Sequence, residues 1–427
     1  MRFLAILEDS FREAIASYVT MVQLALTIIF VLMMASVSFE PVQASAAFEP
    51  MGLYLVETFR EPSGGPAPPE IPYNSRSPFM VHNARPLNGP ATPTSIYTVT
   101  VAVQCADPKA AENLRQSPES MLEFIRGQFG RIGGWRYVEV TDARLLDSGI
   151  SLGNPVRFEL TVQPTANMRL LWPHQTKVLF GLISLDGGGR SMPLGESLWT
   201  LENNVMNVGA AWVVVLLSIV VTAFFIPNML RKGAVDLLLV RPLSRPQLLI
   251  YRYISGVIYV GTTVGLMVTA VWVVLGLRSG IWNPGILLSV PVITFFFAIL
   301  FAVSAMVGVV TRSPVTAILL TCIVWFGLWI LGLVYGYMDM TRETPGENDA
   351  WAYPLVDTLH AILPRTTDLD LLLRKVLIDQ LLDTVQARQM GVQPMPAITW
   401  GSSLTVSLAF IGVMLTLGSW RFHRRDY

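Results

Sequence analysis

The side chains of this chain that could do chemistry are few and scattered. Its 427 residues hold four histidines and two cysteines, which are His82, His174, His360, His423, Cys105 and Cys322. None of the histidines has a partner at the spacing of metal ligands. Cys105 belongs to a polar region and Cys322 to an apolar run, so we expect no intrachain disulfide. The sequence therefore predicts no catalytic residue and no metal site.

ATP chemistry within this chain is excluded by the placement of its lysines. The four lysines, Lys109, Lys177, Lys232 and Lys375, are preceded by Pro, Thr, Arg and Arg. A phosphate-binding loop of the GxxxxGK[ST] type needs a Gly-Lys pair, so none is present. The chain is therefore not expected to be an ATPase, and we expect no cofactor in it. If ATP drives the protein, a separate subunit binds it.

Composition indicates an integral membrane protein. Apolar residues make up 52% of the chain and charged residues 14%, and mean hydropathy is +0.51. The formal net charge of zero gives no reason to expect nucleic acid as a partner. Runs of about 25 uncharged residues exceed the roughly 20 that a membrane span needs. They predict six transmembrane helices at 17–38, 205–228, 253–277, 285–310, 315–337 and 399–420.

The predicted fold is a mainly α-helical polytopic membrane protein with an α+β extracytoplasmic domain inserted between transmembrane helices 1 and 2. Residues 39–94 are rich in Pro and Gly and predict an extended linker. The domain itself is expected at 95–204. Alternation of apolar and polar residues predicts strands at 97–103 and 156–162, and an apolar run predicts another at 178–185. A helix is expected from Ser117.

A second extracytoplasmic segment, 338–398, is expected to be helical. It places Leu369, Leu372, Leu373, Val376, Leu377 and Leu381 on one side of a helix. That apolar stripe needs a cover. Three alternatives are open: it packs on the outer mouth of the spans, it packs on the 95–204 domain, or its helix simply tiles the membrane domain.

The segment 229–252 between two spans is the most distinctive part of the chain. It is rich in Arg and Lys, which is typical of cytoplasmic loops. Its apolar residues follow helical spacing, and Ser244 with Gln247 predicts a capping box that starts the next helix. The result would be a stiff helical elbow. It could transmit force from a cytosolic partner, or it could only anchor the protein beside lipid headgroups.

Charge placement puts both termini in the cytoplasm. Residues 1–16 are expected to form an interfacial helix, with Phe11 on its apolar face and Arg12 on its polar face. Basic residues also mark the tail, 421–427. A signal peptide cleaved after 44–46 is the rival interpretation of the first apolar run. Three acidic residues precede that run, whereas a secretory leader should be basic.

Three short motifs resemble those of ABC-2 type permeases, the membrane subunits of a class of ABC transporters. Residues 233–245 resemble the family's "GT(L/V)(D/E)LLLs(K/R)P(I/L)SR" segment, with Ala234 in place of the usual threonine. Residues 9–14 are similar to its "DSFREA" opening, and 422–427 resemble its "FxRRD" ending. The chain is most similar to permeases labelled for multicopper-enzyme maturation or generic export.

This resemblance implies function, partners and candidate residues. It implies a permease subunit that moves an unidentified substrate, by export, across the plasma (inner) membrane. The implied partners are an ABC ATPase subunit that binds ATP, a second permease copy forming a homodimer or heterodimer, and the lipid bilayer. The residues implied to couple to the ATPase are Gly233, Asp236, Leu238, Leu239, Arg241, Pro242, Ser244 and Arg245, with Phe11 and Arg12 alongside. The resemblance also implies that segment 338–398 closes the outer end of the pathway. The alternative function is a non-transporting membrane sensor or scaffold that acts through its extracytoplasmic domain.

Overall fold

The computed structural model describes residues 2–60, 78–146, 155–184, 191–229, 244–340, 352–389 and 398–424. The chain divides into two compact units. Unit 1 comprises Met1–Ala35, Leu201–Gln380 and Pro394–Tyr427, and unit 2 comprises Ser36–Thr200 and Leu381–Gln393. The two units are described separately.

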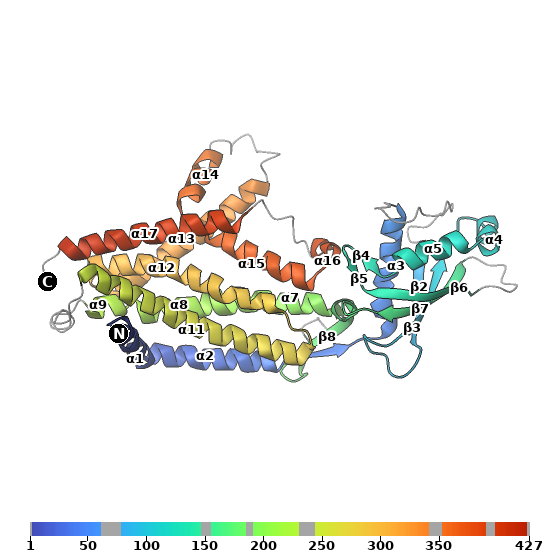
Figure 1. Cartoon of the computed structure of the whole chain (residues 1–427), viewed down its shortest axis with the longest axis horizontal. Helices are drawn as coiled ribbons and strands as arrows, with labels where there is room; N and C mark the ends of the chain where they lie inside the picture. The colour runs from blue at the N-terminus through green and yellow to red at the C-terminus, as the bar shows by residue number, and fades with distance from the viewer. Residues whose placement is uncertain are drawn as a thin grey trace. The chain divides into compact units, whose positions relative to one another are not determined.

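Unit 1 is a bundle of long helices (Figure 1). Its elements in chain order are α1 (Arg2–Ile15), α2 (Tyr18–Ala35), the end of α7 (Leu194–Asn204), a π-helix (Val205–Val214), α8 (Val215–Thr222), α9 (Phe225–Met229), α11 (Arg245–Ser279), a 3-10 turn (Pro284–Leu288), α12 (Ser289–Thr311), α13 (Pro314–Met340), α14 (Ala352–Ile362), α15 (Thr366–Leu381) and α17 (Trp400–Arg424). The start of α1 and the end of α17 lie at the same end of this bundle (Figure 1).

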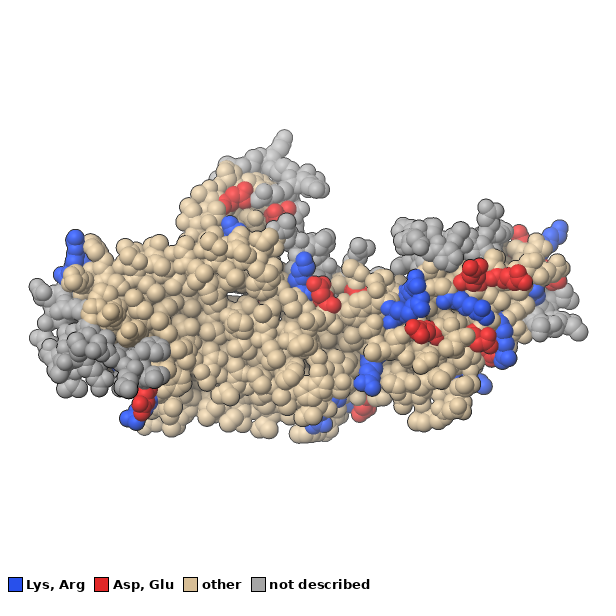
Figure 2. Space-filling view, viewed as in Figure 1, with Lys and Arg blue, Asp and Glu red and all other residues tan. Residues whose placement is uncertain are grey.

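Six segments of the described chain are long and apolar enough to cross a membrane, in agreement with the six predicted helices. They are Tyr18–Ala35, Trp212–Met229, Pro246–Ser279, Pro284–Thr311, Pro314–Asp339 and Trp400–Arg424. Figure 2 shows few charged side chains over the spans on the face in view, whereas Lys, Arg, Asp and Glu gather on unit 2. Large apolar side chains such as Ile29 and Ile323 are exposed. Lipid can cover such a surface, so the chain is an integral membrane protein.

Helix α12 is the centre of the bundle, because it packs against α11, α13 and α17. The contact with α11 is closest at Gly256, where a Cβ atom would lie 2.5 Å from the Phe301 ring. Tyr253, one turn earlier, stacks on the same ring with centroids 5.3 Å apart and donates a hydrogen bond to the Ala298 carbonyl at 2.8 Å. Gly256 therefore permits the close approach of the two helices.

The apolar stripe of α15 is buried, as its pattern required. Leu369, Leu373 and Leu377 are each 3% exposed or less. Leu369 and Leu373 line a cavity whose other walls include Trp212 and Trp329 of the spans. Leu369 and Leu373 of this stripe therefore face the spans.

Unit 2 is built on an antiparallel sheet with strand order β2, β3, β7, β6. Its elements are β1 (Ser38–Pro41), α3 (Ala44–Arg60), β2 (Phe79–Pro86), β3 (Tyr97–Val103), α4 (Pro108–Gln116), α5 (Glu119–Gln128), β4 (Arg131–Ile132), β5 (Trp135–Arg136), β6 (Val138–Leu145), β7 (Val156–Pro164), α6 (Met168–Leu171), β8 (Pro173–Val178), β9 (Ile183–Ser184), β10 (Met192–Pro193), the start of α7, and α16 (Thr384–Gln389). A second sheet has the order β1, β8, β10, with β9 on β8, and β4 pairs with β5. The strands expected at 97–103 and 156–162 are present, as is the helix expected from Ser117.

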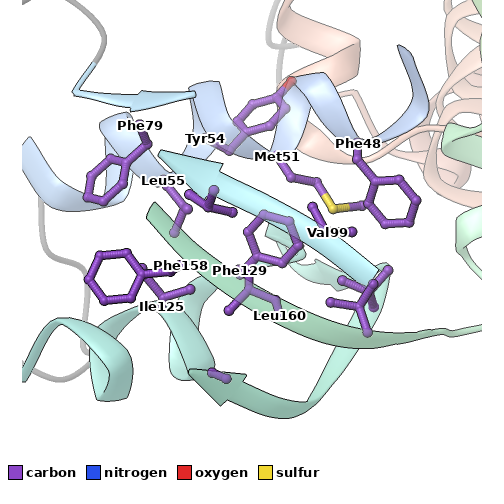
Figure 3. Packing of buried hydrophobic residues seen from close by; sticks show 14 of the residues in the cluster. Phe48, Met51, Tyr54, Leu55, Phe79, Val99, Ile125, Phe129, Phe158 and Leu160 are labelled. Atoms are coloured by element: carbon purple, nitrogen blue, oxygen red, sulfur yellow. The ribbon is translucent and has the colours of Figure 1, made fainter. Parts of the chain in front are cut away.

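The prediction of an extended linker at 39–94 is wrong, because α3 and β2 lie within this range. Phe48, Met51 and Leu55 of α3 pack into the core of unit 2 with side chains of β3, β7 and α5 (Figure 3). The apolar spacing of α3 is helical, but Pro50 interrupts it and the Pro- and Gly-rich residues that follow obscure it. The mixed α/β unit therefore begins at Ser36 rather than at residue 95.

The strand expected at 178–185 is also wrong. The strand β8 ends at Val178, and the chain turns back so that Val178 pairs with Ile183 of β9. Leu179 and Phe180 have φ angles of 52° and 56°, values that are uncommon for residues other than glycine and occur in tight turns. The apolar residues of this run belong to a hairpin turn rather than to one strand.

Asp383 joins the segment 381–393 to the rest of unit 2. Its Oδ1 accepts a hydrogen bond from the Gln386 backbone N–H at 2.9 Å, while Gln386 Oε1 accepts from the Asp383 N–H at 3.3 Å. This is a capping box at the start of α16. The other oxygen, Oδ2, accepts from the Tyr137 hydroxyl at 2.6 Å. Burial raises the pKa of Tyr137, and so does the Asp383 carboxylate, which keeps the phenol a donor.

We predict that Tyr137→Phe loosens residues 381–389. The substitution leaves the buried Asp383 carboxylate with one partner fewer, which costs about 1–3 kcal/mol. Backbone hydrogen exchange in 381–389 should speed up by about tenfold or more. The control is Tyr97→Phe, which deletes a hydroxyl that donates to Thr92 O instead. Unchanged exchange in 381–389 of Tyr137→Phe would contradict this role.

Candidate functional site

The structure describes the two ends of the predicted elbow, 229–252, and leaves residues 230–243 undescribed. Helix α9 ends at Met229, and α11 begins after Ser244, which is its N-cap. The predicted capping box is confirmed, since the Gln247 N–H donates to Ser244 Oγ at 3.4 Å and the Ser244 N–H donates to Gln247 Oε1 at 3.1 Å. Arg245 is the first residue of α11. The other predicted coupling residues, Gly233, Asp236, Leu238, Leu239, Arg241 and Pro242, lie outside the described residues.

Four polar side chains link α1 to both flanks of this segment, and we call them the Arg252 cluster. The Arg252 Nη1 of α11 donates to Ser10 Oγ at 2.8 Å and to Glu13 Oε2 at 3.2 Å. The Asn228 Nδ2 of α9 donates to Glu13 Oε1 at 2.8 Å. The Glu13 carboxylate of α1 therefore contacts α9, the last helix before residues 230–243, and the second turn of α11, the first helix after them.

The Arg252 cluster is costly to break. The Arg252 residue is 5% exposed and Ser10 is fully buried. A guanidinium removed from water needs charged or polar partners, and deleting one partner of a buried pair costs about 3–5 kcal/mol. Here Glu13 retains 30% exposure of its side chain, so the cost lies toward the lower part of that range. The cluster therefore ties the two flanks to α1.

Phe11 and Arg12 of α1, both predicted to lie beside the coupling segment, have different surroundings in the structure. Phe11 lies edge-on against the ring of Tyr259 in α11, with centroids 5.9 Å apart. Arg12 points away from the bundle and pairs with Glu8 at 2.6 Å, and the two side chains are 78% and 64% exposed. An exposed pair of this kind stabilises the protein little. Phe11 is therefore a packing contact with α11, while the guanidinium of Arg12 is accessible.

The sequence did not predict a series of polar contacts inside the spans. The Tyr259 hydroxyl lies 3.0 Å from Thr20 Oγ1 and donates to Gln23 Oε1 at 3.4 Å. Gln23 Nε2 in turn donates to Ser218 Oγ at 3.1 Å. These contacts link α2, α8 and α11. The signal available in the sequence was the amide Gln23 in an otherwise apolar run, because a polar side chain in such a run needs a partner.

The opposite end of the spans carries a second polar group, centred on Glu202. Its Oε2 accepts from Asn283 Nδ2 at 2.6 Å, and Asn283 Oδ1 accepts from the Gly285 N–H at 3.0 Å. The same N–H also donates to Gln380 Oε1 of α15 at 3.0 Å. Glu202 is 3% exposed, and burial raises its pKa to about 8 in spite of the Asn283 hydrogen bond. This group connects α7 and α15 to the 3-10 turn that precedes α12.

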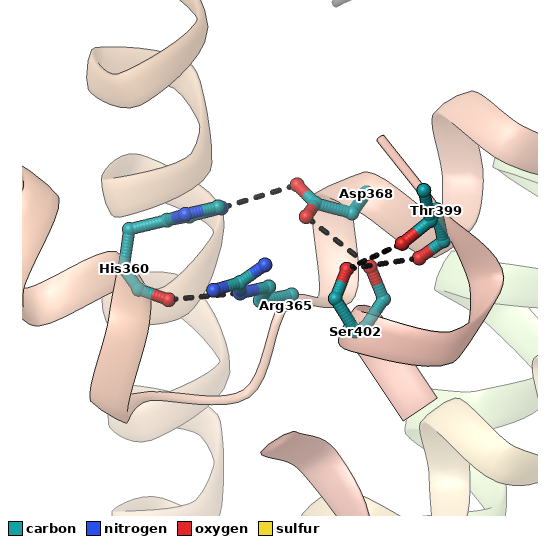
Figure 4. A network of polar contacts seen from close by, with 6 residues as sticks. His360, Arg365, Asp368, Thr399 and Ser402 are labelled. Atoms are coloured by element: carbon teal, nitrogen blue, oxygen red, sulfur yellow. Dashed lines mark hydrogen bonds and ion pairs between the residues drawn. The ribbon is translucent and has the colours of Figure 1, made fainter. Parts of the chain in front are cut away.

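A third polar group joins α14, α15 and α17 (Figure 4). His360 Nε2 lies 3.1 Å from Asp368 Oδ1, and the Ser403 hydroxyl donates to Asp368 Oδ2 at 3.3 Å. The His360 ring stacks on Tyr335 of α13 with centroids 3.6 Å apart. Because Asp368 lies between the histidine and the serine, His360 does not contact the serine hydroxyl as a general base would. The geometry fits a structural tie.

Fold and polar contacts together define a polytopic membrane protein whose short flanking helices are tied to the spans by buried polar groups. A family model described as "ABC-2 family transporter protein" matches residues 4–427. The chain therefore belongs to this family, as its motifs indicated. A search of curated proteins found no match. Membership implies a permease component of an ABC transporter, a membrane setting and an ABC ATPase partner.

We predict that the free energy of unfolding of the protein falls with rising pH because of Glu202. Its pKa is raised from an ordinary value of 4.5 to about 8, so the folded state favours the protonated acid. The stabilisation is complete below about pH 4.5 and is lost as pH rises toward 8, at about 1.4 kcal/mol for each pH unit crossed. Glu202→Gln should remove this loss. The check is the thermal midpoint of the detergent-purified protein between pH 5 and 9.

The control for this prediction is Asp379→Asn, which changes an exposed carboxylate of α15. It should leave the pH dependence as in the wild type. Parallel curves for wild type and Glu202→Gln across the whole range would refute a buried, protonated Glu202.

Proposed function

We propose that this chain is the membrane-spanning permease subunit of an ATP-driven ABC-2 type transporter that exports its substrate with a separate ATPase subunit. The observation that carries this proposal is the family match over residues 4–427. The sequence adds a second support, since it contains no phosphate-binding loop. ATP is then bound by the partner, and this chain converts the partner's movement into a change of the spans.

The contact with the ATPase is made by residues 229–252, with α1 beside them. The Arg252 cluster supports this assignment, because it connects Asn228, immediately before this segment, and Arg252, its last residue, to α1. ATP binding can shift the permease only through contacts that differ between its two states. A capped start of α11 and a buried ion pair resist local bending, so displacement of the elbow is passed to α9, α11 and α1 as a unit.

The same proposal places the protein in the plasma (inner) membrane with both termini in the cytoplasm. Arg and Lys gather at the elbow and at the C-terminal tail, the pattern of cytoplasmic segments. Unit 2 and the helices α14 and α15 are then extracytoplasmic. Two permease copies, identical or different, pair in the assembled transporter.

The first test is purification of the detergent-solubilised protein followed by identification of its companions by mass spectrometry. A polypeptide with a phosphate-binding loop and the other ABC ATPase motifs should co-purify in stoichiometric amount. A complex that lacks any ATPase would favour the alternative of a membrane sensor or scaffold.

We predict that Leu238→Asp combined with Leu239→Asp uncouples the partner without removing the protein from the membrane. Carboxylates in the apolar stripe of the elbow would oppose docking of the ATPase. The rate of ATP hydrolysis by the complex, relative to the isolated ATPase, should change on the order of tenfold. The matched control replaces both residues by Ile. Equal rates for the Asp and Ile variants would count against the elbow.

A second coupling prediction concerns Arg252→Gln. Loss of the guanidinium frees Glu13 from α11 and leaves Asn228 as its partner from α9, so less of the elbow's movement should reach α1. We expect weaker coupling of ATP hydrolysis and a lower thermal midpoint, whereas Arg252→Lys should retain part of both. The matched control is Arg278→Gln at the other end of α11, where the guanidinium donates to the Ala35 carbonyl at 2.5 Å. Similar coupling in the Arg252→Gln and Arg278→Gln variants would refute the role of the cluster.

A further inference from the structure

A cavity of about 500 Å³ lies inside unit 1 between α15 and the spans. Much of its wall is aromatic, formed by Trp212, Phe296, Trp325 and Trp329. The Trp212 and Trp325 rings lie 4.9 Å apart, and Trp329 meets Trp212 edge-on at 6.0 Å. Its volume falls within the range of about 300–1,000 Å³ that is usual for small-molecule sites.

The polar side of this cavity is contributed by α15. Asp370 and Arg374 line it and pair with each other, with Arg374 Nε 3.0 Å from Asp370 Oδ2. Their side chains remain 34% and 37% exposed, so both charges are accessible from the cavity. Thr366 and Thr367 add hydroxyl groups beside them. The cavity thus offers an aromatic wall together with one negative and one positive group.

A second hollow, a groove of about 470 Å³, shares Trp212 and Trp325 with this cavity. Its other lining residues include Leu319, Ile323 and Phe326 of α13, which are 61%, 66% and 54% exposed. In a membrane these side chains would face acyl chains. The two tryptophans therefore form a common wall between a lipid-facing groove and the cavity with the charged pair.

Trp212 lies in the π-helix Val205–Val214. π-helical turns are rare and occur frequently at functional sites. This observation is independent of the cavity, and it places unusual backbone at the same wall.

The chemistry of these walls selects one kind of ligand. An apolar chain can enter from the groove and lie against the tryptophan rings at little cost in desolvation. A headgroup with only a negative charge would satisfy Arg374 but repel Asp370. A zwitterionic headgroup can place its anion at Arg374 and its cation at Asp370, so both charges of the pair gain a partner. The limited volume favours one chain over two.

We propose that this cavity binds a single-chain zwitterionic amphiphile that enters from the bilayer past Trp212 and Trp325. The site goes beyond the coupling function proposed above and does not depend on it, because binding needs only unit 1 in a membrane. Failure to find an ATPase partner would leave this proposal standing, and absence of binding would leave the coupling proposal standing.

The test uses the full-length protein in nanodiscs and a single-chain phosphocholine that carries a photoreactive diazirine in its chain. After irradiation, mass spectrometry should find the label on peptides that contain Trp212 or residues 325–329. Excess unlabelled single-chain phosphocholine should displace it, and the same chain with an uncharged glycerol headgroup should displace it about tenfold less effectively. Uniform labelling of all spans without competition would overturn the proposal.

Substitutions test which residues bind the headgroup of the ligand and which bind its chain. Arg374→Gln and Asp370→Asn should each raise the concentration for half-maximal labelling about tenfold, and Arg374→Lys should restore part of the loss. Asp370→Asn should also remove the preference for the zwitterion over an anionic single-chain sulfate. Trp212→Ala with Trp325→Ala should reduce the labelling, and Trp282→Phe, outside the cavity, should not. Equal labelling of wild type, Arg374→Gln and the double tryptophan variant would overturn the proposal, provided that their thermal midpoints agree.

Discussion

Unit 1 depends on one constraint at the end where α1 begins and α17 ends: the guanidinium of Arg252 is out of water and must keep its partners. Its Nη1 donates to Ser10 and Glu13 of α1, and Asn228 donates to the other oxygen of the Glu13 carboxylate. Parting any of these helices would leave a buried charge unpaired, at a cost of several kcal/mol. Such a cost is a large share of the free energy of unfolding of a typical domain, which is about 5–15 kcal/mol. The three helices are therefore expected to move as one body.

The same rule organises the other end of unit 1, where short helices meet the spans. Asn283 satisfies the carboxyl group of Glu202, and Asp368 bridges His360 and Ser403. Apolar packing alone is not directional and would leave these short helices free to slide. Directional hydrogen bonds between buried groups remove that freedom. Polar ties thus fix the ends of the bundle, while close packing such as that at Gly256 shapes its middle.

The features that the sequence predicted are the local and periodic ones. Long uncharged runs predicted six spans, and the capping box of Ser244 depends on residues three positions apart. The polar groups could not be predicted, because Glu13 is more than 200 positions from Asn228 and Arg252. Only tertiary packing brings them together. A partial signal did exist in Gln23, whose amide in an apolar run required some partner. Helix α3 was missed for another reason, since Pro50 disguised a helical spacing.

Helix α11 connects the two ends through a single rigid element. It runs without interruption from Arg245 to Ser279, about 50 Å, and ends at Gly280 in a left-handed turn. The next residues lead to Asn283, which holds Glu202 just before the π-helix that carries Trp212. A rigid helix that tilts displaces its far end. Tilting of α11 at the Arg252 cluster would therefore displace the Asn283 turn and, through Glu202, the tryptophan wall of the cavity.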